Sequence, residues 1–502
     1  MNWINQIGNW NPQFLRECRG HLKPRSVIAT LGTSAVFQIL FCALVFQNVT
    51  TASQIDARWL YVCRILMWLL PYFIFIAGGY YLVNDLTQEE KKGTLNFIRL
   101  SPRPAREILL GKLLGVPILP YLVVLSVVPL HIFSMVQIGV PPTFFFSYYT
   151  LLGATAFFYF SLALLAGITQ NLQPKKASSA IIFAAFSLLI FSPFFMFWNI
   201  NTSWRYVATA FPLFDTSAPR SSIAWLYTSL TEGNFWAYGF TLINLIIVTG
   251  LVWWMLERLF HQPKTTLISK RCSYLLTAYI NVLIWGFFQH RELVSDPELF
   301  VGFQNLYLAN FGLVLFFLLA LTPRRQQLFD WLSYSKTNLA TRLWMDKSPA
   351  FSAVGVNILI AGLLVWPWLI VVLRASSVSM HFLIMPLSIV LSWLIYAAIA
   401  QIIFTSQVRS PALWTAGSIL LLIIVPLIAL VIFQNGTAMN PLWMVYRTVF
   451  GYPFSFYDET PSGLVAALYG GMALQGVVLA VLVTVLRRRL QQLRRLVQSP
   501  RG

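Results

Sequence analysis

Residues 84–112 combine acidic, basic, apolar and helix-breaking residues in one short stretch, the most informative one for function in this sequence. The segment reads NDLTQEEKKGTLNFIRLSPRPAREILLGK. Thr87 followed by Glu90 three residues later is a capping-box pattern, which predicts a helix that begins at Thr87. A Ser-Pro step ends this helix, so it is short and amphipathic, with Glu89 and Glu90 on a solvated surface. We expect a short amphipathic helix held at the membrane surface between two spans, with an ordinary interfacial loop as the alternative.

Motifs for catalysis and for metal binding are missing from the sequence. Gly111-Lys112 is followed by Leu113, where a phosphate-binding loop needs Ser or Thr. There is no HExxH or GxSxG motif, and the four cysteines lack metal-ligand spacing. We therefore expect no catalytic residue, metal site or cofactor in this chain, and no hydrolysis of ATP by the chain itself.

The elements that position residues 84–112 are membrane-spanning helices. Hydrophobic residues make up 58% of the 502 residues and charged residues only 10%, against about 25% charged residues in soluble domains. The apolar residues form blocks of roughly 17–25, the length a helix needs to cross about 30 Å of hydrocarbon. These blocks lack the alternation of barrel strands, so helices satisfy the backbone. Twelve blocks lie near 27–47, 64–84, 112–134, 144–169, 178–198, 236–257, 273–289, 304–322, 350–372, 379–403, 411–433 and 464–486.

The distribution of positive charge sets the expected orientation. With the N-terminus inside, 28 of the 35 Lys and Arg residues fall in the inner segments and seven in the outer loops, as the positive-inside rule requires. Both termini are therefore expected in the cytoplasm. Anionic lipid headgroups account for the net charge of +19, so no nucleic-acid partner is needed. The seventh block is short and holds Asn281, so a re-entrant or interfacial segment is its alternative.

The two halves of the chain share an outline, which predicts an internal repeat. Each half has two spans, a charged cytoplasmic segment, two spans around a short basic loop, and two spans joined by a long outer segment rich in aromatics. An even number of spans in each half makes the two six-helix repeats parallel. The predicted divisions are an amphipathic segment (1–26), a first half (27–258), a second half (259–486) and a basic cytoplasmic tail (487–502).

In residues 84–112, the order of an acidic pair, Lys-Gly-Thr-Leu, Ser-Pro and Ile-Leu-x-Gly-Lys resembles the cytoplasmic loop of type-2 ABC exporter permeases. In that family, this stretch is the coupling helix that seats on a separate ATPase subunit. Residues 11–25 likewise resemble the family's amphipathic elbow helix. The resemblance covers residues 11–258. It implies ATPase-coupling roles for Glu89, Glu90, Gly93, Thr94, Leu95, Ser101, Pro102, Gly111 and Lys112.

The matching segment of the second half, within 323–349, reads RRQQLFDWLSYSK and lacks Gly-Thr-Leu. Its position makes Arg324, Arg325, Asp330 and Trp331 the expected coupling residues there. Their charge order differs from that of the first half. A socket shaped for the first helix should fit the second poorly, because specificity depends on differences in contact.

Buried charge in the spans would indicate ion coupling, and none is predicted. No Asp, Glu, Lys or Arg lies near the middle of a predicted span, which argues against a proton- or sodium-driven transporter. Six polar residues remain, and hydrogen bonds between helices are their expected role, with substrate lining as the alternative. They are Gln38, Asn244, Asn281, Asn310, Asn357 and Gln401.

The resemblance implies the permease subunit of an ABC-type exporter with two fused halves, which moves an unidentified, amphipathic substrate. Its expected partners are ATP-binding subunits and membrane lipid, and its expected location is the bacterial inner membrane. Two other classes fit the same outline: an ATP-independent secondary transporter or channel, and a membrane assembly subunit that transports nothing.

The orientation is tested by thiol labelling in intact cells. Cysteines placed at Ser222 and Asn440 should react with an impermeant reagent, whereas cysteines at Gln173 and Gln498 should not, because Lys and Arg favour the inner face. Labelling at Gln498 from outside would mean an odd number of spans and would contradict the repeat.

Overall fold

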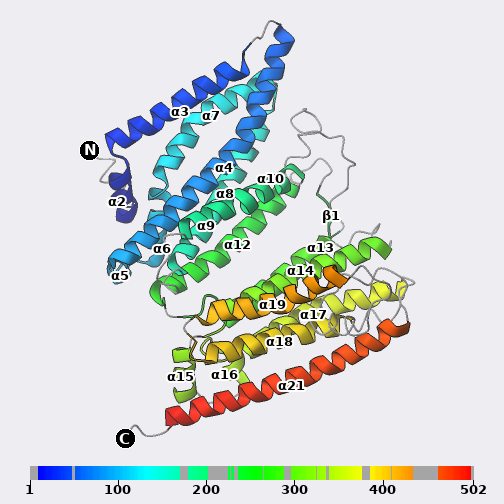
Figure 1. The fold of residues 1–502 in the computed structure, drawn as a ribbon. Helices are drawn as coiled ribbons and strands as arrows, with labels where there is room; N and C mark the ends of the chain where they lie inside the picture. Colours follow the sequence, from blue (N-terminus) through cyan, green and yellow to red (C-terminus); the bar gives the residue numbers. More distant parts are fainter. Residues whose placement is uncertain are drawn as a thin grey trace. The chain divides into compact units, whose positions relative to one another are not determined.

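The computed structural model is almost entirely helical in the part of the chain that it describes (Figure 1). Eight helices in this part are long and apolar enough to cross a membrane. Two strands, β1 (Ala224–Trp225) and β2 (Thr228–Ser229), pair in a small sheet. The predicted class, an α-helical protein with several membrane-spanning helices, is confirmed. The described residues are 10–47, 51–169, 179–201, 224–226, 228–230, 236–263, 265–287, 296–323, 325–334, 339–375, 385–408, 410–433 and 462–498.

The chain forms two compact units, one of residues 1–224 with 229–264 and one of residues 225–228 with 265–502. The first unit is built around one long helix, α4, which packs against α3, α7, α8 and α9. Glycines allow α4 and α8 to pack closely. A Cβ atom at Gly78 of α4 would meet the Phe160 ring of α8, and one at Gly167 of α8 would meet Leu86 of α4. The helices of this unit are α2 (Pro12–His21), α3 (Pro24–Val45), α4 (Ala52–Lys92), α5 (Thr94–Arg99), α6 (Ala105–Gly115), α7 (Ile118–Gln137), α8 (Pro142–Thr169), α9 (Ser179–Phe186), the π-helix η2 (Ser187–Phe191), α10 (Ser192–Asn201) and α12 (Trp236–His261).

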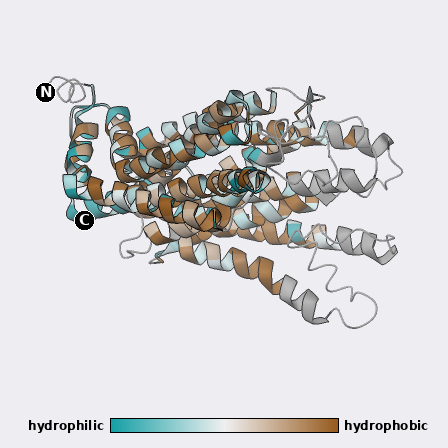
Figure 2. Cartoon of the chain, turned by 90° about the horizontal axis from the view of Figure 1, so that it is seen from above, coloured by the Kyte–Doolittle hydropathy of each residue, from teal (hydrophilic) through white to brown (hydrophobic). Residues whose placement is uncertain are grey.

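The second unit is centred on α18, which packs against α14, α17, α19 and α21. Among the coloured helices of Figure 2, hydrophobic residues, drawn in brown, predominate. Its helices are α13 (Lys270–Phe287), α14 (Asp296–Ala320), α15 (Arg325–Tyr334), α16 (Leu339–Trp344), α17 (Ala350–Ala375), α18 (Met385–Thr405), α19 (Pro411–Phe433) and α21 (Ser462–Gln498).

Every predicted span falls on helical residues for most of its length, but three boundaries were wrong. The helix expected to begin at Thr87 does not: α4 continues through it to Lys92, and the Thr87 hydroxyl donates to the carbonyl of Val83. The third span begins at Ile118, because Pro117 separates it from α6. The expected tail continues α21 as helix to Gln498. The long outer segments lie mostly outside the described residues.

Buried amides join helices in the second unit, as predicted for the polar residues of the spans. Asn281 on α13 and Asn310 on α14 exchange two hydrogen bonds, of 2.9 and 2.8 Å. Asn357 on α17 bonds the Thr277 hydroxyl of α13 at 2.7 Å. The Gln401 side chain of α18 accepts from the Ala350 amide of α17 at 2.8 Å. In the first unit, the Gln38 amide donates to Ser34 of its own helix, and Asn244 donates to Phe240 of its own helix.

Replacing Asn281 by Leu should lower the free energy of unfolding by about 1–2 kcal/mol, because Asn310 then loses its side-chain partner in a buried site. The double variant N281L/N310L should lose less than the sum of the two single variants, since both amides are removed. Denaturation in detergent micelles measures each value. Thr484→Val, at an exposed hydroxyl that bonds its own helix, is the control. Strictly additive losses would contradict a coupled amide pair.

Candidate functional site

Gly93 forms the joint between α4 and α5. It adopts a left-handed conformation with φ of 73° and ends α4, a conformation that favours glycine because it has no Cβ. The Thr94 hydroxyl donates to the carbonyl of Glu89 at 3.2 Å across this joint. The predicted coupling residues Gly93, Thr94 and Leu95 thus set the angle at which α5 leaves the membrane helix.

The short helix α5 has one buried and one exposed apolar face. Leu95 and Ile98 are buried. On the other face, Phe97 is 80% exposed, and Leu100, the C-cap residue that directly follows α5, is 85% exposed. These two residues lie three positions apart, which places them side by side on the helix surface. The described part of the chain covers neither of these large apolar side chains, so both are available for contact with another molecule.

Charged groups brace the buried side of α5. The Arg99 guanidinium lies 3.8 Å from the Glu90 carboxylate and 5.9 Å from the centroid of the Phe260 ring on α12. Beyond α5, the Ser101 hydroxyl accepts from the backbone amide of Arg103 at 3.4 Å, in the turn that contains Pro102. Glu90 and the Ser-Pro turn therefore hold α5 in place.

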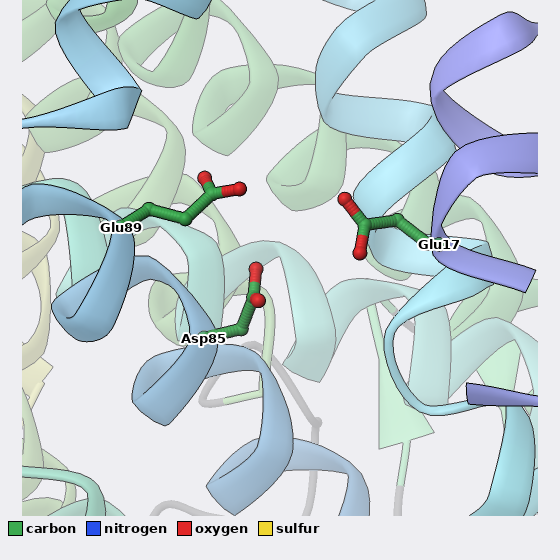
Figure 3. A group of neighbouring side chains, drawn as sticks. All are labelled: Glu17, Asp85 and Glu89. Atoms are coloured by element: carbon green, nitrogen blue, oxygen red, sulfur yellow. The ribbon is translucent and has the colours of Figure 1, made fainter. Parts of the chain in front are cut away.

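Behind this joint, Lys112 lies in a cluster of three carboxylates. Its ammonium nitrogen is 2.7 Å from Asp85 Oδ2, 2.8 Å from Glu89 Oε2 and 3.4 Å from Glu17 Oε1. The Lys112 side chain is completely buried. Figure 3 shows the three carboxylates pointing toward one another from α2 and α4. This ion cluster ties α2, α4 and α6 together at a single nitrogen atom.

The ion cluster has the donor set of a cation site, with three carboxylate oxygens within 4.8 Å of one another. The Lys112 ammonium supplies the positive charge that a metal ion would bring. Burial alone would lower the pKa of Lys112, but Asp85, Glu17 and Glu89 raise it, and the net change is upward. Lys112 is therefore charged at neutral pH and balances part of the carboxylate charge. Arg16, 3.4 Å from Glu89, adds a further positive charge.

Two glycines let α2 reach the ion cluster. A Cβ atom at Gly111 would lie 2.7 Å from Asn11 Oδ1, and one at Gly115 would lie 2.6 Å from Glu17 Cβ. Asn11 caps α2 by accepting from the Phe14 amide at 3.0 Å, and its own amide donates to the Glu107 carbonyl at 2.7 Å. Gly111, predicted as a coupling residue, thus serves the packing of α2 on α6.

Sequence reasoning found only part of this site. Glu89 was expected on a solvated surface, but it is 7% exposed and pairs with Lys112, because α4 extends past it as helix. Glu17 and Asp85 were not among the predicted site residues. No short-range pattern relates Glu17 to Lys112, since they lie 95 positions apart. The only sequence signal for Glu17 was its position as a single carboxylate in the mostly basic segment 1–26.

The second-half residues do not form a matching exposed surface. Arg324 lies outside the described residues. The Arg325 guanidinium is 5.2 Å from the centroid of the Phe329 ring. Asp330 pairs with Lys347 at 3.4 Å, with both side chains about half exposed. Trp331 is 3% exposed, within an apolar cluster that includes Leu493 of α21.

The second unit has its own buried lysine, which the sequence analysis missed. Lys270, at the start of α13, donates to the carbonyls of Arg342 at 2.6 Å and Pro349 at 3.1 Å, and to the Ser348 hydroxyl. Its backbone amide donates to Asp346 at 2.9 Å. These bonds tie the start of α13 to the segment before α17.

Comparison with family models, curated proteins and solved structures finds no match for this chain. The assignment of a function therefore rests on the motif order of residues 84–112 and on the geometry around α5 and Lys112.

Replacing Lys112 by Met should destabilise the protein by about 3–5 kcal/mol, because the buried Glu17 and Glu89 and the partly buried Asp85 lose their common cation. The variant should regain stability as the pH falls toward about 5, since mutual repulsion raises the carboxylate pKa values and the folded state then takes up protons. Denaturation at several pH values measures both effects. Arg103→Met, which removes an exposed pair with Glu107, should cost at most about 1 kcal/mol. A stable, pH-independent K112M protein would contradict this role.

Proposed function

We propose that this chain is the membrane-spanning subunit of an ABC-type exporter, with two fused six-span halves and with ATP hydrolysed by separate subunits. Both termini lie in the cytoplasm, and the membrane is the bacterial inner membrane. The substrate is an amphipathic molecule that passes between the halves. The exposed pair Phe97 and Leu100 on α5 is the observation that carries this proposal, because it offers a preformed contact for a partner on the cytoplasmic side.

The position of α5 favours a protein partner over a lipid surface. The apolar run of α4 ends at Val83, so Gly93 lies about 15 Å farther along the helix at 1.5 Å per residue. The headgroup layer on one side of a bilayer is only about 5–7 Å thick. With Val83 at the edge of the hydrocarbon and α4 near the membrane normal, Phe97 and Leu100 lie beyond the headgroups, within reach of a cytoplasmic protein.

Two features support the fused two-half architecture. The compact units meet in the chain between Lys264 and Thr265, close to the predicted division at 258. Each unit also ties the segment before its first predicted span to the segment before its third through one buried lysine. Lys112 does this with Glu17 in the first unit, and Lys270 does it with Ser348 in the second.

An ion-driven secondary transporter is the second candidate, and the ion cluster around Lys112 favours it. Buried carboxylates are the usual means by which such transporters bind protons or sodium. In this chain the carboxylates lie past the apolar run of α4 and are already paired with Lys112. Transport by the purified chain in vesicles, driven by a proton or sodium gradient without ATP, would favour this candidate.

Purification of the tagged chain from its native membranes tests the first candidate. The eluate should contain an ATPase subunit and hydrolyse MgATP. In F97A/L100A, the amount of bound ATPase should fall at least about tenfold, because exposed apolar anchors carry most of the binding energy of such contacts. The stability of the chain should change by at most about 0.5 kcal/mol, since both side chains are solvated.

Leu496→Ala is the matched control, because Leu496 is 65% exposed and lies on a different helix. Absence of any ATPase from the wild-type eluate would refute the exporter proposal. ATPase binding that survives F97A/L100A would refute α5 as the docking helix.

A further inference from the structure

The C-terminal part of α21 lies against α15. The Arg489 guanidinium donates to the Ile402 carbonyl at 3.3 Å and to the Ser406 hydroxyl, at the end of α18. Beyond this anchor α21 continues for nine residues, to Gln498. Leu486 and Leu493 are buried at 4% and 7% exposure. Leu490 lies between them at helical spacing and packs on the same apolar cluster.

The partner of this leucine stripe is the helix expected to dock an ATPase in the second half. Leu328, Trp331 and Leu332 of α15 are 1%, 3% and 6% exposed, and they form one cluster with Leu493. No large apolar side chain in Arg325–Ser333 is exposed. By contrast, α5 of the first unit leaves Phe97 and Leu100 in solvent. The two cytoplasmic helices thus differ in whether their apolar contact face is free.

We infer that residues 486–498 form a latch that occupies the docking face of α15. The chain therefore binds one ATPase subunit at α5, and it binds a second at α15 only when the latch has left. This inference rests on the proposed function. The occupant of the face is a segment of this chain, and its competitor is the apolar socket of an ATPase subunit.

Two features of the contact between the latch and α15 favour its reversible opening. Among the described residues, the buried indole Nε1 of Trp331 has no hydrogen-bond acceptor, and burying an N–H without an acceptor opposes the packing. The four arginines on the outer side of the latch, at 487, 488, 494 and 495, are exposed. They keep a released latch soluble and attract it to anionic headgroups.

The full-length variant L490D/L493D tests the latch, with L496D as the matched control because Leu496 is exposed outside the cluster. Trypsin cleaves at the tail arginines, and its rate follows the open population. Cleavage should rise at least about tenfold in L490D/L493D and stay unchanged in L496D. Trp331→Phe removes the unpaired N–H and should slow cleavage relative to wild type. A misfolded variant would be cleaved faster, so slower cleavage of W331F distinguishes a change in latch opening from misfolding.

The number of ATPase subunits bound to each chain gives the second readout. The probe is the ATPase that co-purifies with the wild-type chain, added in excess with MgATP. Wild type and L496D should bind one copy, and L490D/L493D should bind two. Unchanged cleavage, two copies on wild type, or a released latch with no second copy would each overturn the inference. Failure of the proposed function would give a different result from failure of the latch inference. In that case no variant would bind an ATPase, but trypsin would still cleave L490D/L493D faster than wild type.

Discussion

One buried ammonium group, that of Lys112, holds α2, α4 and α6 of the first unit together. Glu17, Asp85 and Glu89 reach it from two different helices, and Lys112 itself belongs to a third. A charge buried in this way is tolerated only while its partners stay in place. The position of α2, the last two turns of α4 and the start of α6 are therefore linked: none of them shifts without separating ion pairs inside the protein.

This linkage also supports α5. The helix is too short to be stable alone, yet it keeps a fixed direction because Gly93 joins it to a braced helix end and Arg99 is held between Glu90 and Phe260. Its exposed residues Phe97 and Leu100 are thus presented on a rigid support. A movement of a partner bound there would pass to α4 and from there into the membrane-spanning helices.

The halves reach similar connections by different chemistry. In the first unit a lysine meets carboxylates, whereas in the second Lys270 meets backbone carbonyls and the Ser348 hydroxyl. The apolar faces of α5 and α15 also differ, since Leu493 of α21 packs on α15 whereas Phe97 and Leu100 are exposed. The two short helices are therefore not structurally equivalent.

The sequence by itself determined the helical class, the positions of most helices and several of the polar contacts between them. These follow from local quantities: the length of an apolar run, and the need of an amide such as Asn281 for a partner in an apolar surrounding. It also marked Gly93 and Lys112 as candidate site residues.

Only the tertiary structure decided which contacts these residues make. Glu17 and Lys112 are far apart in the chain, Glu89 is buried because α4 does not stop at Asn84, and Trp331 is covered by a helix more than 150 positions later. Such pairings depend on which surfaces meet, and local patterns carry no record of them.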